Sequence, residues 1–222
     1  MMYMGGKARL AKYIVPILQR YIDRRVYLEP FCGMCNIVKN VRAITRIASD
    51  IHPDLIMMLQ EGQTGKFVPP MTVTEELHKS LKHAPPSALR AFVGFSYSFR
   101  GSFFGGFDHH RRHLYQESFR QLMRLCYNVT FYHCNYSQWY DIHDALIYCD
   151  PPYEGTSACG AEDFDTPAFW EQCRKWVAQN NIVFVSEYKA PKDFYPVWSM
   201  CRTDVDNKTS VQENLFVLEG SL

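Results

Sequence analysis

Apolar residues gather along the chain in short runs, which alternate with segments whose apolar positions recur at helical spacing. The runs predict strands at 26–31, 46–50, 128–134, 145–150 and 182–186, with a closing hairpin from 203–206 and 213–219. The spaced segments predict helices at 10–21, 36–44, from 53 onward, at 74–82, at 115–125 and at 167–180. This alternation of strands and helices predicts an α/β fold with a Rossmann-like sheet.

The alternation breaks in the middle of the chain. Residues 61–86 contain two Pro-Pro pairs among mixed polar residues, and residues 88–107 are dense in Phe, Tyr, Ser and Gly. We therefore predict a core made of residues 1–60 and 128–222, with a small inserted region at 61–127. The aromatic residues of the insert are core residues by default.

One predicted strand ends at a group of residues suited to chemistry. The apolar run 145–149 stops at Asp150, Pro151, Pro152 and Tyr153. Because Pro151 has no N–H for a sheet ladder, the strand should end at Asp150. Ligands of open α/β sheets lie at the carboxyl ends of strands, so the sequence predicts a carboxylate and an aromatic ring at such a site.

This group of residues suits a flat substrate that carries an amino group. Asp150 and the carbonyl of Pro151 can each accept a hydrogen bond from an exocyclic amine, and Tyr153 can stack on a base. An amine held by two acceptors directs its lone pair outward, towards an electrophilic methyl group. The alternative is an ordinary turn after a strand, because Asp and Pro are common turn residues.

A second candidate site follows the first predicted strand. Gly33 stands in a tight strand-to-helix turn, with Asn36 as the N-cap of the following helix. Asp50 ends the next strand 17 residues after Gly33. That separation is close to the ~20 residues at which an acid can meet ribose hydroxyls in nucleotide-binding units.

Composition limits the classes of protein. The chain has 222 residues, is 47% hydrophobic and carries a formal net charge of +1, so any nucleic-acid surface must come from local clustering of charge. Its apolar runs fall short of the ~20 residues needed to span a bilayer, so we expect a soluble protein without a membrane partner. Eight cysteines without a signal peptide indicate a reducing, cytoplasmic compartment.

At this point the chain resembles a known family, the Dam-like amino-group DNA adenine methyltransferases, most closely their small phage-encoded members. The resemblance follows the chain in order. It rests on Tyr3-Met4-Gly5-Gly6-Lys7, Glu29-Pro30-Phe31-Cys32-Gly33, Ser49-Asp50-Ile51, the segment Ser96–Phe103 with Phe104-Gly105-Gly106, Asp150-Pro151-Pro152-Tyr153 and Val183-Phe184-Val185-Ser186-Glu187-Tyr188.

The resemblance implies an S-adenosylmethionine-dependent methyltransferase sheet with a target-recognition insert. It implies S-adenosylmethionine as the methyl donor and an adenine of double-stranded DNA, flipped out of the helix, as the acceptor. No metal is implied, because the sulfonium is already an activated electrophile. The residues that match the family's cofactor positions are Tyr3, Lys7, Phe31, Gly33, Asp50 and Asp150; those that match its catalytic motif are Asp150, Pro151, Pro152 and Tyr153.

Basic residues of the insert are candidates for DNA contact. Arg100 lies in the segment that resembles the family, which favours a phosphate or base contact. Arg111 and Arg112 lie in the run 109–113, the most basic patch of the chain. They are either phosphate ligands or part of a solvated loop.

The sequence also departs from the family. Met34 and Cys35 follow Gly33, where relatives commonly carry glycine or other small residues, and the segment between Asp50 and the aromatic segment is shorter than in the larger bacterial members. The recognition elements are therefore reduced, and the target sequence does not transfer. Cys32 and Cys35 form a single C-x-x-C, too few ligands for the usual four-ligand structural zinc site, and their context disfavours a redox pair.

Two rival functions stay open. The same amine-recognising site suits an enzyme that methylates cytosine, RNA or a protein amide. A non-catalytic DNA-binding or cofactor-binding homologue is suggested by Met34, whereas intact Asp150 and Tyr153 argue against it. The chain contains nothing that resembles a nuclease, so it is expected to modify DNA rather than cut it, and the existence of a partner nuclease in a restriction-modification pair stays open.

Overall fold

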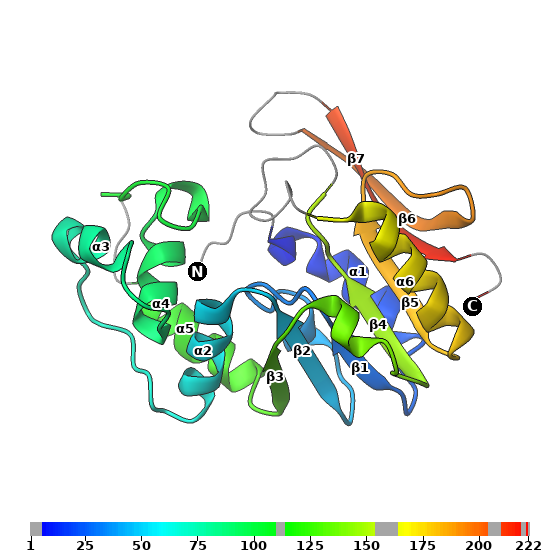
Figure 1. Cartoon of the computed structure of the whole chain (residues 1–222), viewed down its shortest axis with the longest axis horizontal. Helices are drawn as coiled ribbons and strands as arrows, with labels where there is room; N and C mark the ends of the chain where they lie inside the picture. Colours follow the sequence, from blue (N-terminus) through cyan, green and yellow to red (C-terminus); the bar gives the residue numbers. More distant parts are fainter. Residues whose placement is uncertain (1–5, 110–113, 154–163, 204–209, 219–220, 222) are drawn as a thin grey trace.

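A seven-stranded mixed sheet forms the centre of the protein (Figure 1). The computed structural model describes residues 6–109, 114–153, 164–203, 210–218 and 221. The strands are β1 (Val26–Glu29), β2 (Arg46–Asp50), β3 (Val129–His133), β4 (Ala145–Cys149), β5 (Ile182–Glu187), β6 (Phe194–Thr203) and β7 (Ser210–Leu218), in the order β3-β2-β1-β4-β5-β7-β6. This sheet confirms the predicted α/β, Rossmann-like fold.

The first five strands of the sheet run parallel, and β7 runs antiparallel between β5 and β6. Leu28 of β1 aligns with Ile47 of β2 on one side and with Ile147 of β4 on the other. The carboxyl ends of β1, β2 and β4 therefore meet at one edge of the sheet, where ligands of such sheets bind.

Both faces of the sheet are buried, which explains why its central strands read as continuous apolar runs. Tyr148 and Phe184 belong to one hydrophobic cluster, while Ile147 and Val185 belong to another. Because side chains alternate along a strand, the two clusters lie on opposite faces.

Six α-helices lie in the described part of the chain: α1 (Ala11–Gln19), α2 (Pro53–Gln63), α3 (Glu75–Leu81), α4 (Ala88–Ser96), α5 (Leu114–Leu125) and α6 (Thr166–Ala178). The cluster that includes Tyr148 contains residues of α1, α2, α4 and α5, and the cluster that includes Ile147 contains those of α6. Figure 1 shows α2 to α5 gathered at the β3 end of the sheet and α6 over β4 and β5.

The helix starts follow the signals in the sequence. Thr74 and Ser87 cap α3 and α4 by accepting hydrogen bonds from the backbone N–H of Leu77 and Arg90. Pro53 stands in the first turn of α2, where its missing N–H costs nothing. The helices predicted at 10–21, from 53 onward, at 74–82, at 115–125 and at 167–180 are confirmed to within a few residues, whereas α4 was not predicted.

The predicted helix at 36–44 is wrong. The segment instead contains a single 3₁₀ turn, η2 (Val38–Asn40). The Nη1 of the buried Arg46 donates to the carbonyl oxygens of Val38 at 2.9 Å and Val41 at 3.4 Å. These carbonyls would accept from the backbone of a continuing helix, so the arginine replaces helical hydrogen bonding here.

The closing hairpin is confirmed, but its first strand, β6, precedes the predicted range 203–206, of which residues 204–206 lie outside the described residues. β6 begins at Phe194, which pairs with Leu218, and the ladder extends to the pair of Thr203 and Ser210. Pro196 lies within this strand, and the register shifts beside it. Because β6 is an edge strand, a proline can stand in it with its missing N–H on the outer side.

Three further 3₁₀ turns lie near the candidate sites: η1 (Lys7–Arg9), η3 (Phe99–Gly101) and η4 (Tyr136–Trp139). Residues 61–127 form most of the helical group and share a hydrophobic cluster with the sheet. Their division from the core as a separate recognition region stays a prediction. None of the helices in the described ranges combines the length and the apolar character that crossing a membrane requires.

Candidate active site

Asp150 lies directly after β4, whose last residue is Cys149. Its Oδ1 is 2.7 Å from the Nζ of Lys7, which belongs to η1 at the start of the described chain. Lys7 is 5% exposed and the Asp150 side chain 19% exposed. The structure therefore joins two predicted site residues, 143 positions apart in sequence, in a largely buried ion pair.

Tyr153 is held beside the same ion pair. The Nζ of Lys7 lies 4.4 Å from the centroid of the Tyr153 ring, and the Tyr153 hydroxyl donates to Oε1 of Glu213 on β7. The ring of Tyr188, just after β5, meets the Tyr153 ring edge-on at 4.7 Å. Three segments thus converge on the Asp-Pro-Pro-Tyr motif.

Burial dominates the ionisation of this group. It raises the pKa of the Asp150 carboxyl above its ordinary 3.8, while the ammonium of Lys7 opposes the rise. Burial also raises the pKa of the Tyr153 hydroxyl well above 10.0, so this hydroxyl stays a hydrogen-bond donor at neutral pH. The site therefore combines the Asp150 carboxyl, whose pKa depends on burial and on Lys7, with the neutral ring of Tyr153.

The turn after β1 forms a second site at the same edge. Gly33 has a φ of 45°, in the left-handed region that glycine adopts without strain. Its backbone N–H donates to Oδ2 of Asp50 at 2.9 Å, and the N–H of His52 donates to Oδ1 at 3.0 Å. The two predicted cofactor residues Gly33 and Asp50 are therefore in direct contact.

Asp50 is 8% exposed, and burial raises the pKa of its carboxyl, while the N–H groups of His52 and Gly33 oppose the rise. Each carboxylate oxygen keeps lone-pair capacity beyond the one backbone donor named above. The acceptor set at the end of β2 thus fits the hydroxyls of a ribose.

Phe31 follows β1 and belongs to an aromatic group. Its ring centroid lies 5.4 Å from that of Tyr136 in η4, 5.6 Å from that of Phe169 in α6 and 5.9 Å from that of Phe164. The half-buried Phe31 ring thus supplies a fixed apolar wall beside the glycine turn.

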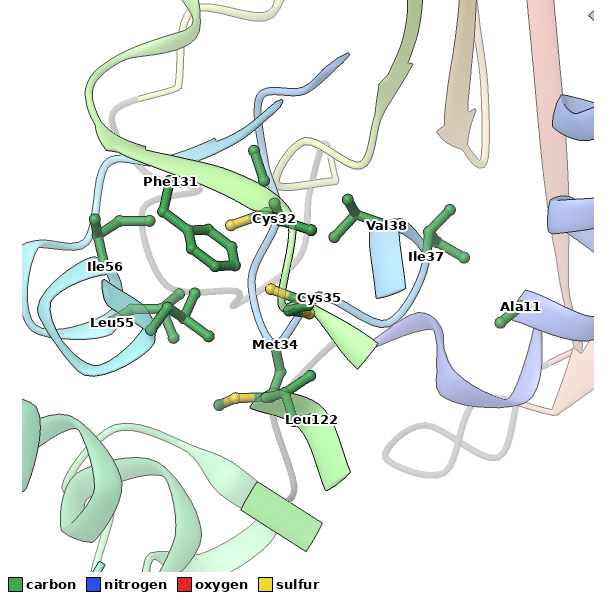
Figure 2. Close-up of a cluster of buried hydrophobic side chains, with 14 of the residues drawn as sticks. Ala11, Cys32, Met34, Cys35, Ile37, Val38, Leu55, Ile56, Leu122 and Phe131 are labelled. Carbon is green, nitrogen blue, oxygen red and sulfur yellow. The ribbon is translucent and has the colours of Figure 1, made fainter. Parts of the chain in front are cut away.

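The side chain of Met34 packs into the hydrophobic core. Its side chain is 4% exposed and belongs to the core cluster. Figure 2 shows it beside Leu122 of α5, with Cys32 and Phe131 on the other side of the turn. The large residue at this position is a packing residue between the turn and α5.

The remaining predicted site residues are not brought into this group by the structure. Arg100 is exposed in η3, on the helical side of the protein, with a φ of 55°. Tyr3, Arg111 and Arg112 lie outside the described residues. Their roles stay predictions.

The residue that sequence reasoning missed is Glu213. It is completely buried on β7 and contacts both Lys7 and Tyr153. An acid two residues before the apolar run Leu215-Phe216-Val217 was the available signal, although a strand end explains it equally well. Among the described residues, no cluster of three or more His, Cys, Asp or Glu side chains is arranged to hold a metal ion.

Comparison of the structure with solved structures finds similar folds at low sequence identity. An rRNA methyltransferase, aviRa, from Streptomyces viridochromogenes has 12% identity and a TM-score of 0.46, with 96% of this chain and 85% of that chain covered. Precorrin 8W decarboxylase from Methanobacterium thermoautotrophicum has 11% identity and a TM-score of 0.41, with 95% and 89% covered. The fold assignment made above rests on the strand order of the sheet itself.

Comparison of the sequence finds a family that part of the chain resembles. No curated protein matches the chain. Residues 3–86 match the sequence profile of the D12 class N6 adenine-specific DNA methyltransferases. The matched segment contains Lys7, Gly33 and Asp50, which the structure places at one edge of the sheet. Over residues 3–86 of its 222, the chain is therefore similar to the D12 class N6 adenine-specific DNA methyltransferases.

Proposed function

We propose that the chain transfers a methyl group from S-adenosylmethionine to the N6 amino group of an adenine flipped out of double-stranded DNA, with Asp150 and Tyr153 at the reacting centre. The observation that carries the proposal is the convergence of Lys7, Asp150, Tyr153 and Glu213 beside the Gly33–Asp50 turn.

Residues of the glycine turn are suited to hold the methyl donor. Asp50 would accept hydrogen bonds from its ribose, Phe31 would form an apolar wall, and Gly33 would let the backbone approach closely. Lys7 and Asp150 would lie at its reactive end, with Tyr3 as a further contact. When bound, the sulfonium supplies an electrophilic methyl group.

Residues of the Asp-Pro-Pro-Tyr motif would act on the target base. Asp150 and the Pro151 carbonyl accept hydrogen bonds from the two amino hydrogens, which directs the nitrogen lone pair towards the methyl group. Pro152 keeps the backbone stiff, and the Tyr153 ring stacks on the base. The surplus amino proton passes to Asp150 or to solvent.

We assign DNA contacts to Arg100, Arg111 and Arg112, and target recognition to residues 61–127. The support is that Arg100 is exposed in a loop packed by helices of that region. Guanidinium groups suit phosphate oxygens.

The test is transfer of labelled methyl groups from S-adenosylmethionine to unmethylated genomic DNA, followed by nucleoside analysis of the product. We expect N6-methyladenine, and Asp150→Asn should lower the rate at least about 100-fold because a positioned acceptor is lost. Asp193→Asn is the control, because Asp193 pairs with Arg174 on the surface and should leave the rate unchanged.

Each contrary outcome counts against a distinct part of the proposal. Label in N4-methylcytosine, in RNA or in protein would identify one of the rival amine methyltransferases. Binding of the methyl donor without transfer to any substrate would identify a non-catalytic homologue.

A further inference from the structure

Glu213 lies where the antiparallel hairpin returns to the active-site edge of the sheet. On β7, Asn214 aligns with Glu187 at the end of β5, so Glu213 stands just beyond the carboxyl end of the parallel strand. It is completely buried. A carboxylate without exposure persists in a fold only where partners compensate its lost hydration, so its contacts indicate its role.

Those contacts are with the reacting centre. Oε1 of Glu213 accepts the hydrogen bond of the Tyr153 hydroxyl and lies 3.4 Å from the Nζ of Lys7. The same Nζ is 2.7 Å from Oδ1 of Asp150. The lysine ammonium is therefore shared between two carboxylates that come from different strands.

The first consequence concerns the Tyr153 ring. Glu213 fixes its hydroxyl end, Lys7 lies over its face and Tyr188 meets it edge-on. A stacking platform contributes to rate only if its plane is fixed before the base arrives, because small misplacements cost large factors in rate. Glu213 holds the hydroxyl end of this ring by accepting its hydrogen bond.

The second consequence concerns Asp150. Oδ1 of Asp150 is engaged by the Lys7 ammonium. A target amine needs the same carboxylate, so the ammonium must yield part of that contact. The second carboxylate, Glu213, lets Lys7 move without leaving its buried charge unpaired.

We propose that Glu213 is a positioning residue of the methyl-transfer site, which fixes the Tyr153 ring through its hydroxyl and holds Lys7 when Asp150 engages the target amine. This inference rests on the proposed function. The β6–β7 hairpin then completes the active site as well as the sheet.

Three variants separate the two contacts. Glu213→Gln keeps an amide oxygen for the Tyr153 hydroxyl but loses the charge that holds Lys7. Glu213→Ala loses both contacts, and Tyr153→Phe loses the hydroxyl but leaves the contact between Glu213 and Lys7 in place. We expect methyl transfer to genomic DNA to fall about 10-fold in Glu213→Gln and about 100-fold in Glu213→Ala, in kcat rather than in KM for DNA.

A double variant tests whether Glu213 acts through the tyrosine. Adding Tyr153→Phe to Glu213→Ala should cost less than Tyr153→Phe costs alone, because the shared hydrogen bond is already lost. Fully additive losses, with wild-type kcat in Glu213→Gln, would overturn the proposal.

Stability needs a matched control, because any buried polar residue supports folding. Asn181 is 3% exposed and bonds to Ala145, Ile142 and Trp176 at the opposite edge of the sheet. Asn181→Ala should lower the melting temperature as Glu213→Ala does, yet leave kcat unchanged. If kcat fell equally in both variants, Glu213 would be a folding residue only.

An NMR measurement of the ligand-free chain makes the inference independent of turnover. The buried ammonium of Lys7, with its signal assigned by its loss in Lys7→Met, should shift in Glu213→Gln and stay in place in Asn181→Ala. If the wild type transfers no methyl group but the Lys7 signal shifts in Glu213→Gln, the proposed reaction is wrong, whereas the interaction of Glu213 with Lys7 is supported. An unshifted signal would overturn the positioning role.

Discussion

Met34 stands in the glycine turn after β1, where the sequence departs from the family that it resembles, and the structure gives it a packing role. Its side chain is 4% exposed and lies against Leu122 of α5 (Figure 2). From the sequence, Met34 was the reason to consider a non-catalytic homologue. The packing removes the need for that explanation.

Replacing Met34 tests this packing role. Met34→Ala should lower the free energy of unfolding by about 2–5 kcal/mol, because it leaves a cavity in the core. Binding of S-adenosylmethionine to the folded protein should stay unchanged, as measured by urea denaturation and by calorimetry. Leu122→Ala, which removes the opposite side of the contact, is the matched control. Weakened binding at unchanged stability would show that Met34 contacts the cofactor.

Lys7 controls the charge of Asp150. Burial raises the pKa of the Asp150 carboxyl above 3.8 and Lys7 opposes the rise, so removal of the ammonium must raise the pKa further. The proposed reaction uses the carboxylate form as an acceptor. Its acidic limit therefore follows the folded-state pKa of Asp150.

Lys7→Met should move the acidic limb of the pH–rate profile to higher pH, measured at saturating S-adenosylmethionine. Because the folded pKa of Asp150 is raised, the protonated form contributes stability below about 3.8 that is lost as pH rises through the folded value. In Lys7→Met, the protonated Asp150 should contribute this stability up to a higher pH than in the wild type. Lys12→Met, on the exposed side of α1, should leave the profile in place, and a downward shift of the limb in Lys7→Met would contradict the assignment.

At the scale of elements, the loop after α4 is shaped by close aromatic packing. Its ends are joined where the N–H of Phe99 donates to the carbonyl of Gly106 and the N–H of Asp108 donates to that of Tyr97. Buried His78 of α3 adds a 2.8 Å hydrogen bond to Ser98. The exposed Arg100 is carried on this braced loop.

Gly94 permits this packing. A Cβ at Gly94 would come within 2.5 Å of the Phe103 ring and 2.6 Å of the Phe104 ring. Gly94→Ala should therefore displace the loop and cost about 1–3 kcal/mol of stability. Because Arg100 would move with the loop, affinity for DNA should fall as well, measured by fluorescence anisotropy with a labelled duplex.

Gly62 offers a matched control on α2. Its Cβ would meet the Phe119 ring at 2.5 Å and the Met123 sulfur at 2.6 Å, on α5 rather than on the loop. Gly62→Ala should cost similar stability and leave DNA affinity unchanged. If both variants lost the same affinity for DNA, the loop that carries Arg100 would have no specific role in DNA binding.

Local patterns predicted most elements, because capping residues, apolar spacing and prolines act over a few positions. They failed where a distant side chain intervened. Arg46 takes the carbonyls of Val38 and Val41, which ends the predicted helix at 36–44 as a 3₁₀ turn. The first half of β6, which contains Pro196, was not predicted, and a proline is tolerated there because β6 is an edge strand.

At the scale of the whole molecule, the strand order brings the ends of β1, β2 and β4 together and inserts β7 beside β5. Lys7, Asp150, Tyr153 and Glu213 are spread from one end of the chain to the other, yet they lie within a single set of contacts. Residues 3–86, which carry the family match, supply one member of that set.

The sequence by itself determined the α/β class, the glycine turn with its acid partner and the Asp-Pro-Pro-Tyr motif, because each is written in residues close together along the chain. Only the tertiary structure decided that Met34 packs into the core, that Lys7 pairs with Asp150 and that Glu213 joins them. The reason is that such contacts depend on strand order and register, which bring together residues that no local pattern connects.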